Sequence, residues 1–380
     1  MTKQIKGVAT HCVHTGTLSD TQHGGVGSPL YSSTSYPFQG VDENRYPRYF
    51  NTPNQVGLAQ KIAALEGAEK GLIFSSGMAA ISTALLGHLK KGDHVVFQND
   101  LYGGTRNFIK ELFPNYGIEF SFVDGHSIEA FEAEIQSNTR GIYVETPSNP
   151  LLHIIDLRSL SRLAQDRGLW TMIDNTFASP INQNPIALGI DIVVHSATKY
   201  LGGHSDISAG AVLTSETLMQ PIYALAKNLG GNLSDQTVWL LERSIKTLKL
   251  RVDAQTKNAG ELAQFLEQQS SISRVYYPGL ESHPQHQLAQ EQMLGFGAML
   301  SFDLKSLNAS DFCNRLELIK PSMSLAGVES TVISPPMASH ALLTPEERQQ
   351  QGISDRLIRF SVGIEAVEDL KADLLKALEG

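Results

Sequence analysis

The chain has 380 residues, of which 41% are hydrophobic and 18% are charged, and its formal net charge is −9 at pH 7. This length fits about two globular domains, and an acidic balance without a basic stripe argues against nucleic acid as a partner. No apolar run approaches the roughly 20 residues that a membrane-spanning helix needs, and the N-terminal segment lacks the apolar core of a signal peptide. The two cysteines, Cys12 and Cys313, lack metal-ligand spacing. We therefore expect reduced cysteines, no metal, no membrane contact and a cytoplasmic location.

Residues 1–48 are rich in Gly, Ser, Pro, Tyr and His and show little periodicity. So long an irregular segment is uncommon in a compact domain without a use for it. We expect residues 1–48 to form an N-terminal arm that contacts a neighbouring subunit.

From residue 49 the sequence alternates between helical periodicity and short apolar strands. Helices are expected over 56–66 and 157–166. A further helix is expected to follow Ser75–Met78 and to run through Leu89. The expected strands cover 72–74, 94–97, 141–144, 169–173 and 192–194. Alternating strands and helices predict an α/β domain over residues 49–243, with a mostly parallel sheet covered on both faces.

The pattern changes near residue 243. We expect one long helix over 235–266, a Gly-rich strand over 296–302 and a terminal helix over 367–378. These elements predict a smaller α+β domain over residues 244–380.

Polar groups follow the first three strands, at the carboxyl ends where an open parallel sheet binds ligands. Gly77 and Met78 open a helix, whose N-terminal N–H groups favour an anion such as phosphate. Tyr102, beside two glycines, is free to lie on an aromatic ring or to donate a proton. Asn149 has a side chain that can bind a carboxylate. Taken singly, a capped helix, a surface turn and a Pro-rich turn explain these residues equally well.

The last two strands are followed by an acid and by a lysine. Asp174 comes directly after an apolar strand and needs a partner, such as a pyridinium nitrogen. Ser196, Thr198 and Lys199 follow the next strand and place two hydroxyls beside an amine. This arrangement suits pyridoxal 5′-phosphate (PLP), whose aldehyde condenses with a lysine. A helix-capping acid and a surface lysine are the simpler explanations, but the four segments that begin at Gly77, Tyr102, Asp174 and Ser196 together supply different parts of one PLP site.

The chain closely resembles the Cys/Met-metabolism PLP-dependent enzymes, the cystathionine γ-synthase-like family, over nearly its whole length. The matching segments are 64–67, 74–80, 92–96, 102–105, 174–180, 195–200, 203–206, 277–280 and 361–365. The resemblance implies a fold-type I (aspartate aminotransferase-like) PLP-dependent enzyme. It also implies a homotetramer built as a dimer of dimers, with active sites shared across the dimer.

The resemblance implies a role for each candidate residue. Lys199 would form the Schiff base, Asp174 would pair with the pyridinium nitrogen, and Tyr102 would stack on the ring; these three are the expected catalytic residues. Further cofactor-binding residues would be Gly77, Met78, Thr176, Ser196 and Thr198, with Tyr46 and Arg48 reaching the phosphate of the neighbouring subunit. Arg359 would bind the substrate α-carboxylate, a bidentate task that suits guanidinium. Substrate would also contact Asn149, Met323 and Ser324.

Departures from the family pattern bear on the reaction. Met323 stands where the γ-synthases and γ-lyases often carry a glutamate suited to the distal ammonium of cystathionine, although a gap-filling methionine is an equal explanation. Gly104 stands where methionine γ-lyases commonly carry a cysteine. His340 is expected to be structural rather than catalytic.

These departures favour β-elimination from L-cystathionine, which gives homocysteine, pyruvate and ammonia. γ-Elimination comes next, and γ-replacement by a cystathionine γ-synthase or a homoserine-ester sulfhydrylase is third. An aminotransferase and a non-catalytic PLP-binding protein are the alternatives from other classes.

Overall fold

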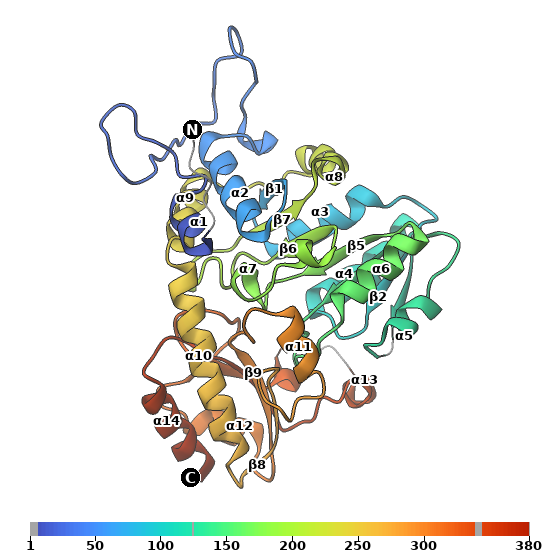
Figure 1. The fold of residues 1–380 in the computed structure, drawn as a ribbon, viewed down its shortest axis with the longest axis vertical. Helices are drawn as coiled ribbons and strands as arrows, with labels where there is room; N and C mark the ends of the chain where they lie inside the picture. The colour runs from blue at the N-terminus through green and yellow to red at the C-terminus, as the bar shows by residue number, and fades with distance from the viewer. Residues whose placement is uncertain (1–6, 124, 339–343, 380) are drawn as a thin grey trace.

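Two β-sheets organise the computed structural model, which describes residues 7–123, 125–338 and 344–379 (Figure 1). Within these residues the larger sheet has seven strands in the order β1-β7-β6-β5-β4-β2-β3. The strands are β1 (Lys70–Phe74), β2 (His94–Gln98), β3 (Glu119–Val123), β4 (Thr139–Glu145), β5 (Trp170–Asp174), β6 (Ile192–His195) and β7 (Gly210–Thr214). Every pair in the sheet is parallel except those that β7 makes with β1 and β6. The predicted mostly parallel sheet is confirmed, and β3 and β7 are additions to it.

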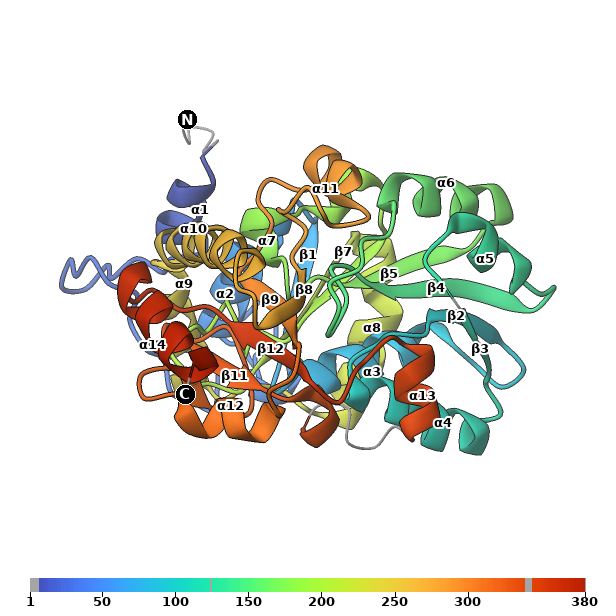
Figure 2. The same ribbon diagram turned by 90° about the horizontal axis from the view of Figure 1, so that it is seen from below.

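Successive side chains of each strand enter opposite cores. In β5, Ile173 belongs to one apolar cluster and Met172 to the other, and Val193 and Val194 divide in the same way in β6. A strand buried on both faces has few polar positions, which explains the continuous apolar runs of the sequence. One face is covered mainly by α2 (Pro53–Glu66) and α6 (Leu157–Arg167), and the other by α3 (Gly77–His88), α4 (Gly103–Tyr116) and α8 (Glu216–Leu229). Figure 2 shows α6 on one side of the sheet and α3, α4 and α8 on the other.

Local capping sets the ends of the predicted helices. Thr52 and Gln55 form a reciprocal capping box at the start of α2, which ends at Gly67 with φ 72°. The helix expected over 56–66 therefore starts three residues earlier, with Pro53 at its first position. α6 agrees with the expectation over 157–166; the carboxylate of Asp156 accepts a hydrogen bond from the Ser159 N–H at 3.0 Å.

The single long helix expected over 235–266 is wrong. Two helices lie there instead, α9 (Asp235–Ile245) and α10 (Leu248–Glu267). At the break, Thr247 leaves helical geometry with φ −105° and ψ 8°. The guanidinium of buried Arg251 donates to the carbonyl of Ser244, which is also buried, at 3.1 Å. This side-chain hydrogen bond supplements a turn bond from the Thr247 N–H to the same carbonyl at 3.3 Å, and the periodicity of the sequence does not reveal it.

The C-terminal part is built on a five-stranded sheet in the order β10-β11-β12-β9-β8. Its strands are β8 (Ile272–Tyr276), β9 (Met299–Leu304), β10 (Lys320–Pro321), β11 (Thr331–Ile333) and β12 (Leu357–Ser361). The expected strand over 296–302 is β9, shifted toward the C-terminus, and the expected terminal helix is α14 (Val367–Glu379). The apolar side of this sheet shares one buried cluster with α10, α14 and the face of the larger sheet that α2 covers. The division into domains at residue 243 stays a prediction.

Shorter helices complete the described chain. They are α5 (Ile128–Ala133), α7 (Ser179–Asn182), α11 (His286–Gln292), α12 (Ala309–Arg315), α13 (Pro345–Gln350) and the 3-10 helices η2 (Pro185–Leu188) and η3 (Pro335–Met337). No helix in the part of the chain that the structure describes is long and apolar enough to cross a membrane.

The N-terminal arm is less irregular than expected. It contains α1 (Val8–His14) and ends in the 3-10 helix η1 (Pro47–Tyr49). Cys12 is buried, and its carbonyl accepts a hydrogen bond from buried Lys61 of α2 at 2.9 Å. Between α1 and η1 the chain forms long loops that extend away from the body of the molecule (Figure 1).

Candidate active site

A cavity of about 590 Å³ lies at the carboxyl ends of the parallel strands and is closed on another side by the loop 323–325 and by Arg359 of β12. Its walls include every predicted site residue except Tyr46 and Arg48. The strand ends supply one side and the C-terminal sheet supplies the other. His340 lies outside the described residues.

The start of α3 forms an anion-binding cup in this cavity. Ser76 caps the helix by accepting a hydrogen bond from the Ala79 N–H at 3.1 Å. The N–H groups of Gly77 and Met78 are at the first two helical positions and have no intrahelical partner. A Cβ atom at Gly77 would lie only 2.8 Å from the Cβ of Ser196. Glycine therefore lets the helix start approach the end of β6, where a phosphate can meet both segments.

The two hydroxyls after β6 are in different situations. Thr198 donates its hydroxyl to the Ala209 carbonyl at 3.1 Å and accepts from the Ala209 N–H at 3.0 Å. Its hydrogen is therefore engaged with the backbone that leads into β7. Of the predicted pair, Ser196 is the better donor for an anion in the cup.

Two acids sit side by side on the cavity wall. Asp174 is the last residue of β5 and pairs in register with Glu145 of β4. The Thr176 N–H donates to Asp174 at 3.0 Å, and the Thr176 hydroxyl accepts from the Ser196 N–H at 2.8 Å. Thr176 thus orients the acid. Burial raises the pKa of Asp174, while the hydrogen bonds from Thr176 and the nearby charge of Lys199 act to lower it. A cation beside Asp174 would relieve this cost.

Lys199 extends across the cavity, and its Nζ donates to the hydroxyl of Ser324 at 2.6 Å. Burial lowers the pKa of Lys199 to about 8, and the positive charge of Arg359 acts in the same direction, while Asp174 opposes both. Near neutral pH an amine in this range is neutral far more often than an ordinary lysine. It is therefore available both as a nucleophile and as a base.

Arg359 is buried on β12 and is held from two sides. Its Nη1 donates to the side-chain oxygen of Asn149 at 2.9 Å, and its Nη2 donates to the Ser324 carbonyl at 3.3 Å. Burial lowers the pKa of Arg359 to about 10. A carboxylate in the cavity would pair with this desolvated guanidinium, so Asn149 orients the arginine as well as lining the site.

The loop after β10 carries backbone strain. Ser324 has φ 80° and Ala326 has φ 66°, although neither is glycine. The Ser361 hydroxyl accepts the Ala326 N–H at 2.7 Å and secures this conformation. Left-handed residues that the surroundings hold in place are common at ligand sites. Here they direct both the hydroxyl and the carbonyl of Ser324 toward the two cations of the cavity.

Tyr102 and Met323 lie at the more open side of the cavity. The Tyr102 N–H donates to Glu145, and the side chain is 47% exposed. A Cβ atom at Gly104 would lie 2.6 Å from the Tyr102 ring, so glycine at 104 permits this ring position. Met323 is 67% exposed and contributes a thioether to the cavity wall.

Tyr46 and Arg48 do not reach the cavity of their own chain. The Arg48 guanidinium donates to the Lys227 carbonyl and lies over the rings of Tyr46 and Tyr49, 5.8 and 5.4 Å from their centroids. This position is compatible with a role in the site of a neighbouring subunit, which stays a prediction.

Glu145 is a cavity residue that the sequence analysis did not single out. It is buried, and its pKa is raised well above the usual range by burial and by the negative charge of Asp174. The sequence pattern could have identified Glu145, because it follows the apolar strand 141–144 in the same way as Asp174 follows the apolar strand 169–173. Phe177 and Asn107 also line the cavity; Phe177 lies in the matching segment 174–180, and no matching segment contains Asn107.

The chemistry of these residues fits PLP. The cup at Gly77 and Met78 suits its phosphate, the lowered pKa of Lys199 suits an amine that must react with its aldehyde, and Asp174 suits its protonated ring nitrogen. The exposed face of Tyr102 is available for stacking on the ring.

Known proteins agree with this assignment. The profile of the Cys/Met metabolism PLP-dependent enzymes matches residues 9–379. A cystathionine beta-lyase of Lactococcus lactis is 43% identical over 376 residues, covering 98% of this chain and 99% of that protein. A cystathionine gamma-lyase of Bacillus subtilis is 44% identical over 374 residues, covering 97% and 98%.

The crystal structure of cystathionine gamma-lyase from Lactobacillus plantarum, complexed with L-serine, superposes with a TM-score of 0.95 at 39% identity, covering 98% of this chain and 99% of that one. With the family profile and close relatives covering nearly the whole chain, the protein belongs to the Cys/Met metabolism family of PLP-dependent enzymes.

Proposed function

We propose that this enzyme is a carbon–sulfur lyase that converts L-cystathionine and water to L-homocysteine, pyruvate and ammonia by β-elimination. The observation that carries the proposal is that one cavity holds an amine, a carboxylate and a guanidinium with distinct tasks: Lys199, Asp174 and Arg359. This set suits an α-amino acid joined to PLP. It leaves open which carbon–sulfur bond breaks.

Each of these groups has a defined part in the reaction. Arg359, held by Asn149 and Ser324, binds the α-carboxylate and fixes the orientation of Cα. The neutral amine of Lys199 removes the proton from Cα, and Lys199 or Tyr102 protonates the departing thiolate. PLP, when bound, acts as the electron sink for this chemistry. Asp174 stabilises the positive charge on the ring nitrogen.

Met323 supports β-elimination over γ-elimination. The carboxylates that line the cavity from described residues are Asp174 and Glu145, and both belong to adjacent strand ends. The thioether of Met323 offers no ion pair to the distal ammonium of cystathionine. A substrate orientation that depends on such an ion pair at residue 323 is therefore disfavoured.

γ-Elimination is the second candidate, because the Bacillus subtilis relative named cystathionine gamma-lyase is 44% identical. Lys199 would then remove a second proton, from Cβ, before the bond at Cγ breaks. The same side chains serve both routes, so only the products separate them.

Incubation of the PLP-loaded enzyme with L-cystathionine tests the proposal. Pyruvate and homocysteine are the expected products, identified by chromatography of the keto acid and the thiol. 2-Oxobutyrate with cysteine would establish γ-elimination instead. No turnover of cystathionine, together with turnover of a homoserine ester and a thiol, would assign γ-replacement.

We further propose a homotetramer built from dimers that share their active sites through the arm. The arm exposes large apolar side chains, with Val26 95% and Phe38 76% exposed. A second copy that covers these side chains would remove the apolar surface from water. The expected mass in light scattering is four chains; a monomer at assay concentration would refute the shared site. The cytoplasmic location stays a prediction.

A further inference from the structure

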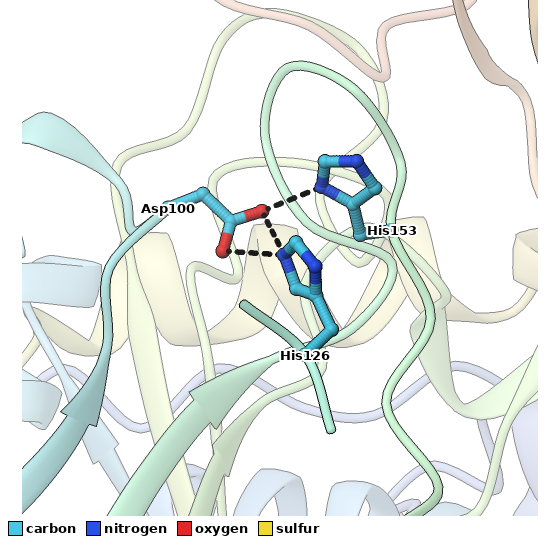
Figure 3. Close-up of side chains that lie close together, drawn as sticks. All are labelled: Asp100, His126 and His153. Carbon is cyan, nitrogen blue, oxygen red and sulfur yellow. Dashed lines mark hydrogen bonds and ion pairs between the residues drawn. The ribbon is translucent and has the colours of Figure 1, made fainter. Parts of the chain in front are cut away.

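A second cluster of ionisable side chains lies outside the active-site cavity. Asp100, His126 and His153 come from three segments: the loop after β2, the loop between β3 and α5, and the loop between β4 and α6. Figure 3 shows both imidazoles directed at the same carboxylate. Two separate loops thus deliver a histidine to one acid.

The distances suit a single metal ion. Oδ2 of Asp100 lies 3.0 Å from Nδ1 of His153 and 3.1 Å from Nε2 of His126. The three ligand atoms all lie within 4.8 Å of one another. Ligand atoms bound to one ion at about 2.0–2.1 Å are separated by roughly 3.0–3.4 Å. Small rotations of the side chains would therefore let an ion replace the hydrogens now shared between these atoms.

The carboxylate is already oriented for such a role. Buried Gln98, the last residue of β2, donates to Oδ1 of Asp100 at 2.6 Å. The backbone N–H of His153 donates to the Ser148 hydroxyl at 3.2 Å. The first bond orients the metal-binding carboxylate, and the second holds the backbone of His153 in place. Asp100 would therefore lose little conformational freedom on binding an ion.

An entry route exists on one side. The side chains of Asp100, His126 and His153 are 12%, 23% and 25% exposed. They line a cavity of about 540 Å³ with Gln350 and Gln351, among others. The cavity has room for water molecules as the remaining ligands. Arg274 also lines this cavity and adds a positive charge that would repel a cation. The negative charge of Asp100 is therefore needed to offset it.

The alternative is a cluster of hydrogen bonds without an ion, in which each neutral imidazole donates its one ring N–H to Asp100. The ring centroids of His126 and His153 are 4.0 Å apart. The two rings and the carboxylate converge on one point beside a cavity with room for water, which a metal site requires and a hydrogen-bond cluster does not. An ion satisfies both rings in their neutral form, which is the ligand form of histidine.

We propose that Asp100, His126 and His153 bind one divalent transition-metal ion, Zn²⁺ or an ion of similar preference, with water completing its coordination. Two imidazoles and one carboxylate form a ligand set that such ions take. The ion would link three loops, one of which leads within two residues to Tyr102 of the active site. The proposal is independent of which sulfur compound the enzyme cleaves.

The test is a metal titration of the PLP-loaded, chelator-treated enzyme. Zn²⁺ is followed by calorimetry, and Co²⁺ by its visible absorption, which reports the ligand geometry. We expect one ion per chain. His126→Ala and His153→Ala should each weaken binding by more than about 100-fold, beyond the roughly 10–100-fold typical for loss of an outer hydrogen-bond partner. His23→Ala, on the exposed part of the arm, should bind as the wild type does.

A second measurement needs no variant. Bound Zn²⁺ should protect His126 and His153 of the wild-type enzyme from diethyl pyrocarbonate, as read by peptide mass spectrometry, whereas His23 should react equally with and without Zn²⁺. Unchanged labelling of both cluster histidines at saturating Zn²⁺ would overturn the proposal. So would equal Zn²⁺ affinity in His126→Ala and wild type, which would place the ion elsewhere, for example on PLP itself.

Discussion

Lys199 lies between charges of opposite sign, and the balance between them determines its reactivity. Burial and Arg359 disfavour its ammonium form, while Asp174 favours it, and its pKa falls to about 8. The amine is protonated below that pH and neutral above it. Because only the neutral amine attacks an aldehyde, the charge state should control the rate of PLP uptake.

We therefore expect the rate at which PLP-free enzyme takes up PLP to rise with pH and level off above about pH 8. Stopped-flow absorption measures this rate. Arg359→Met removes a positive neighbour, so the pKa of Lys199 should rise and the inflection should move to higher pH. An inflection that stays in place in Arg359→Met would mean that this charge does not act on the lysine.

Replacement of the same lysine tests its catalytic role. Lys199→Ala should lower turnover of cystathionine by at least about 10³-fold, because it removes both the nucleophile for PLP and the base for Cα. Keto-acid release measures the loss. Lys257→Ala is the control, since the side chain of Lys257 is 78% exposed and far along the chain in α10. Near-normal turnover in Lys199→Ala would refute the assignment.

At the scale of elements, the contact between α3 and β6 shapes the phosphate cup. Gly77→Ala should weaken PLP binding at least about tenfold, because the new Cβ would lie 2.8 Å from Ser196 and push the helix start away from the strand. Equilibrium dialysis measures the affinity.

Gly260→Ala in α10 is a matched control for the glycine substitution. Its new Cβ would make an ordinary contact, 3.9 Å from the Tyr277 hydroxyl. Alanine in a helix interior stabilises by roughly 0.5–1 kcal/mol relative to glycine. PLP affinity should stay unchanged in this variant, and an equal loss in both would show that the effect is not specific to the cup.

The break between α9 and α10 depends on one buried side chain. Arg251 donates to the carbonyls of Ser244 at 3.1 Å and of Tyr200 at 2.9 Å. Arg251→Met leaves these acceptors buried, and we expect a loss of at least about 2 kcal/mol in the free energy of unfolding. Urea denaturation at fixed protein concentration measures it. The Lys249 side chain is partly exposed and pairs with Asp253 in the same helix, so Lys249→Met should change stability by less than about 0.5 kcal/mol.

At the scale of the whole molecule, the arm decides whether one chain makes a complete site. Arg48 does not reach the cavity of its own chain. If it completes the site of a neighbour, each active site takes Lys199 from one subunit and Arg48 from the other. Lys199→Ala and Arg48→Ala then damage the residues that the two different subunits supply. In a hybrid dimer of the two variants, one site would therefore combine an intact Lys199 from one subunit with an intact Arg48 from the other.

Co-refolding equal amounts of the two variants should therefore restore up to about a quarter of wild-type activity, because half of the dimers are hybrids with one intact site each. The assay is run at limiting PLP, where Arg48→Ala alone is expected to be weak. Activity no higher than the mean of the two separate variants would show that the site is not shared.

Much of the larger sheet and of the cavity wall was predictable from local pattern. Parallel strands buried on both faces leave apolar runs, and polar residues at their carboxyl ends gather at one edge. Gly77, Asp174 and Lys199 were therefore identifiable from their places after such runs. The family resemblance added Arg359, which lies far from them in the sequence.

Other features depended on packing between distant segments. The break at Thr247 needs Arg251, and the shift of the Lys199 pKa needs burial and Arg359. The cluster of Asp100, His126 and His153 needs three loops to meet. The sequence by itself determined the α/β architecture and the chemical groups of the site, since these follow from periodicity and residue type, and the resemblance of its motifs identified the family. Only the tertiary structure decided which groups touch, because distances and desolvation arise when segments far apart in the chain pack together.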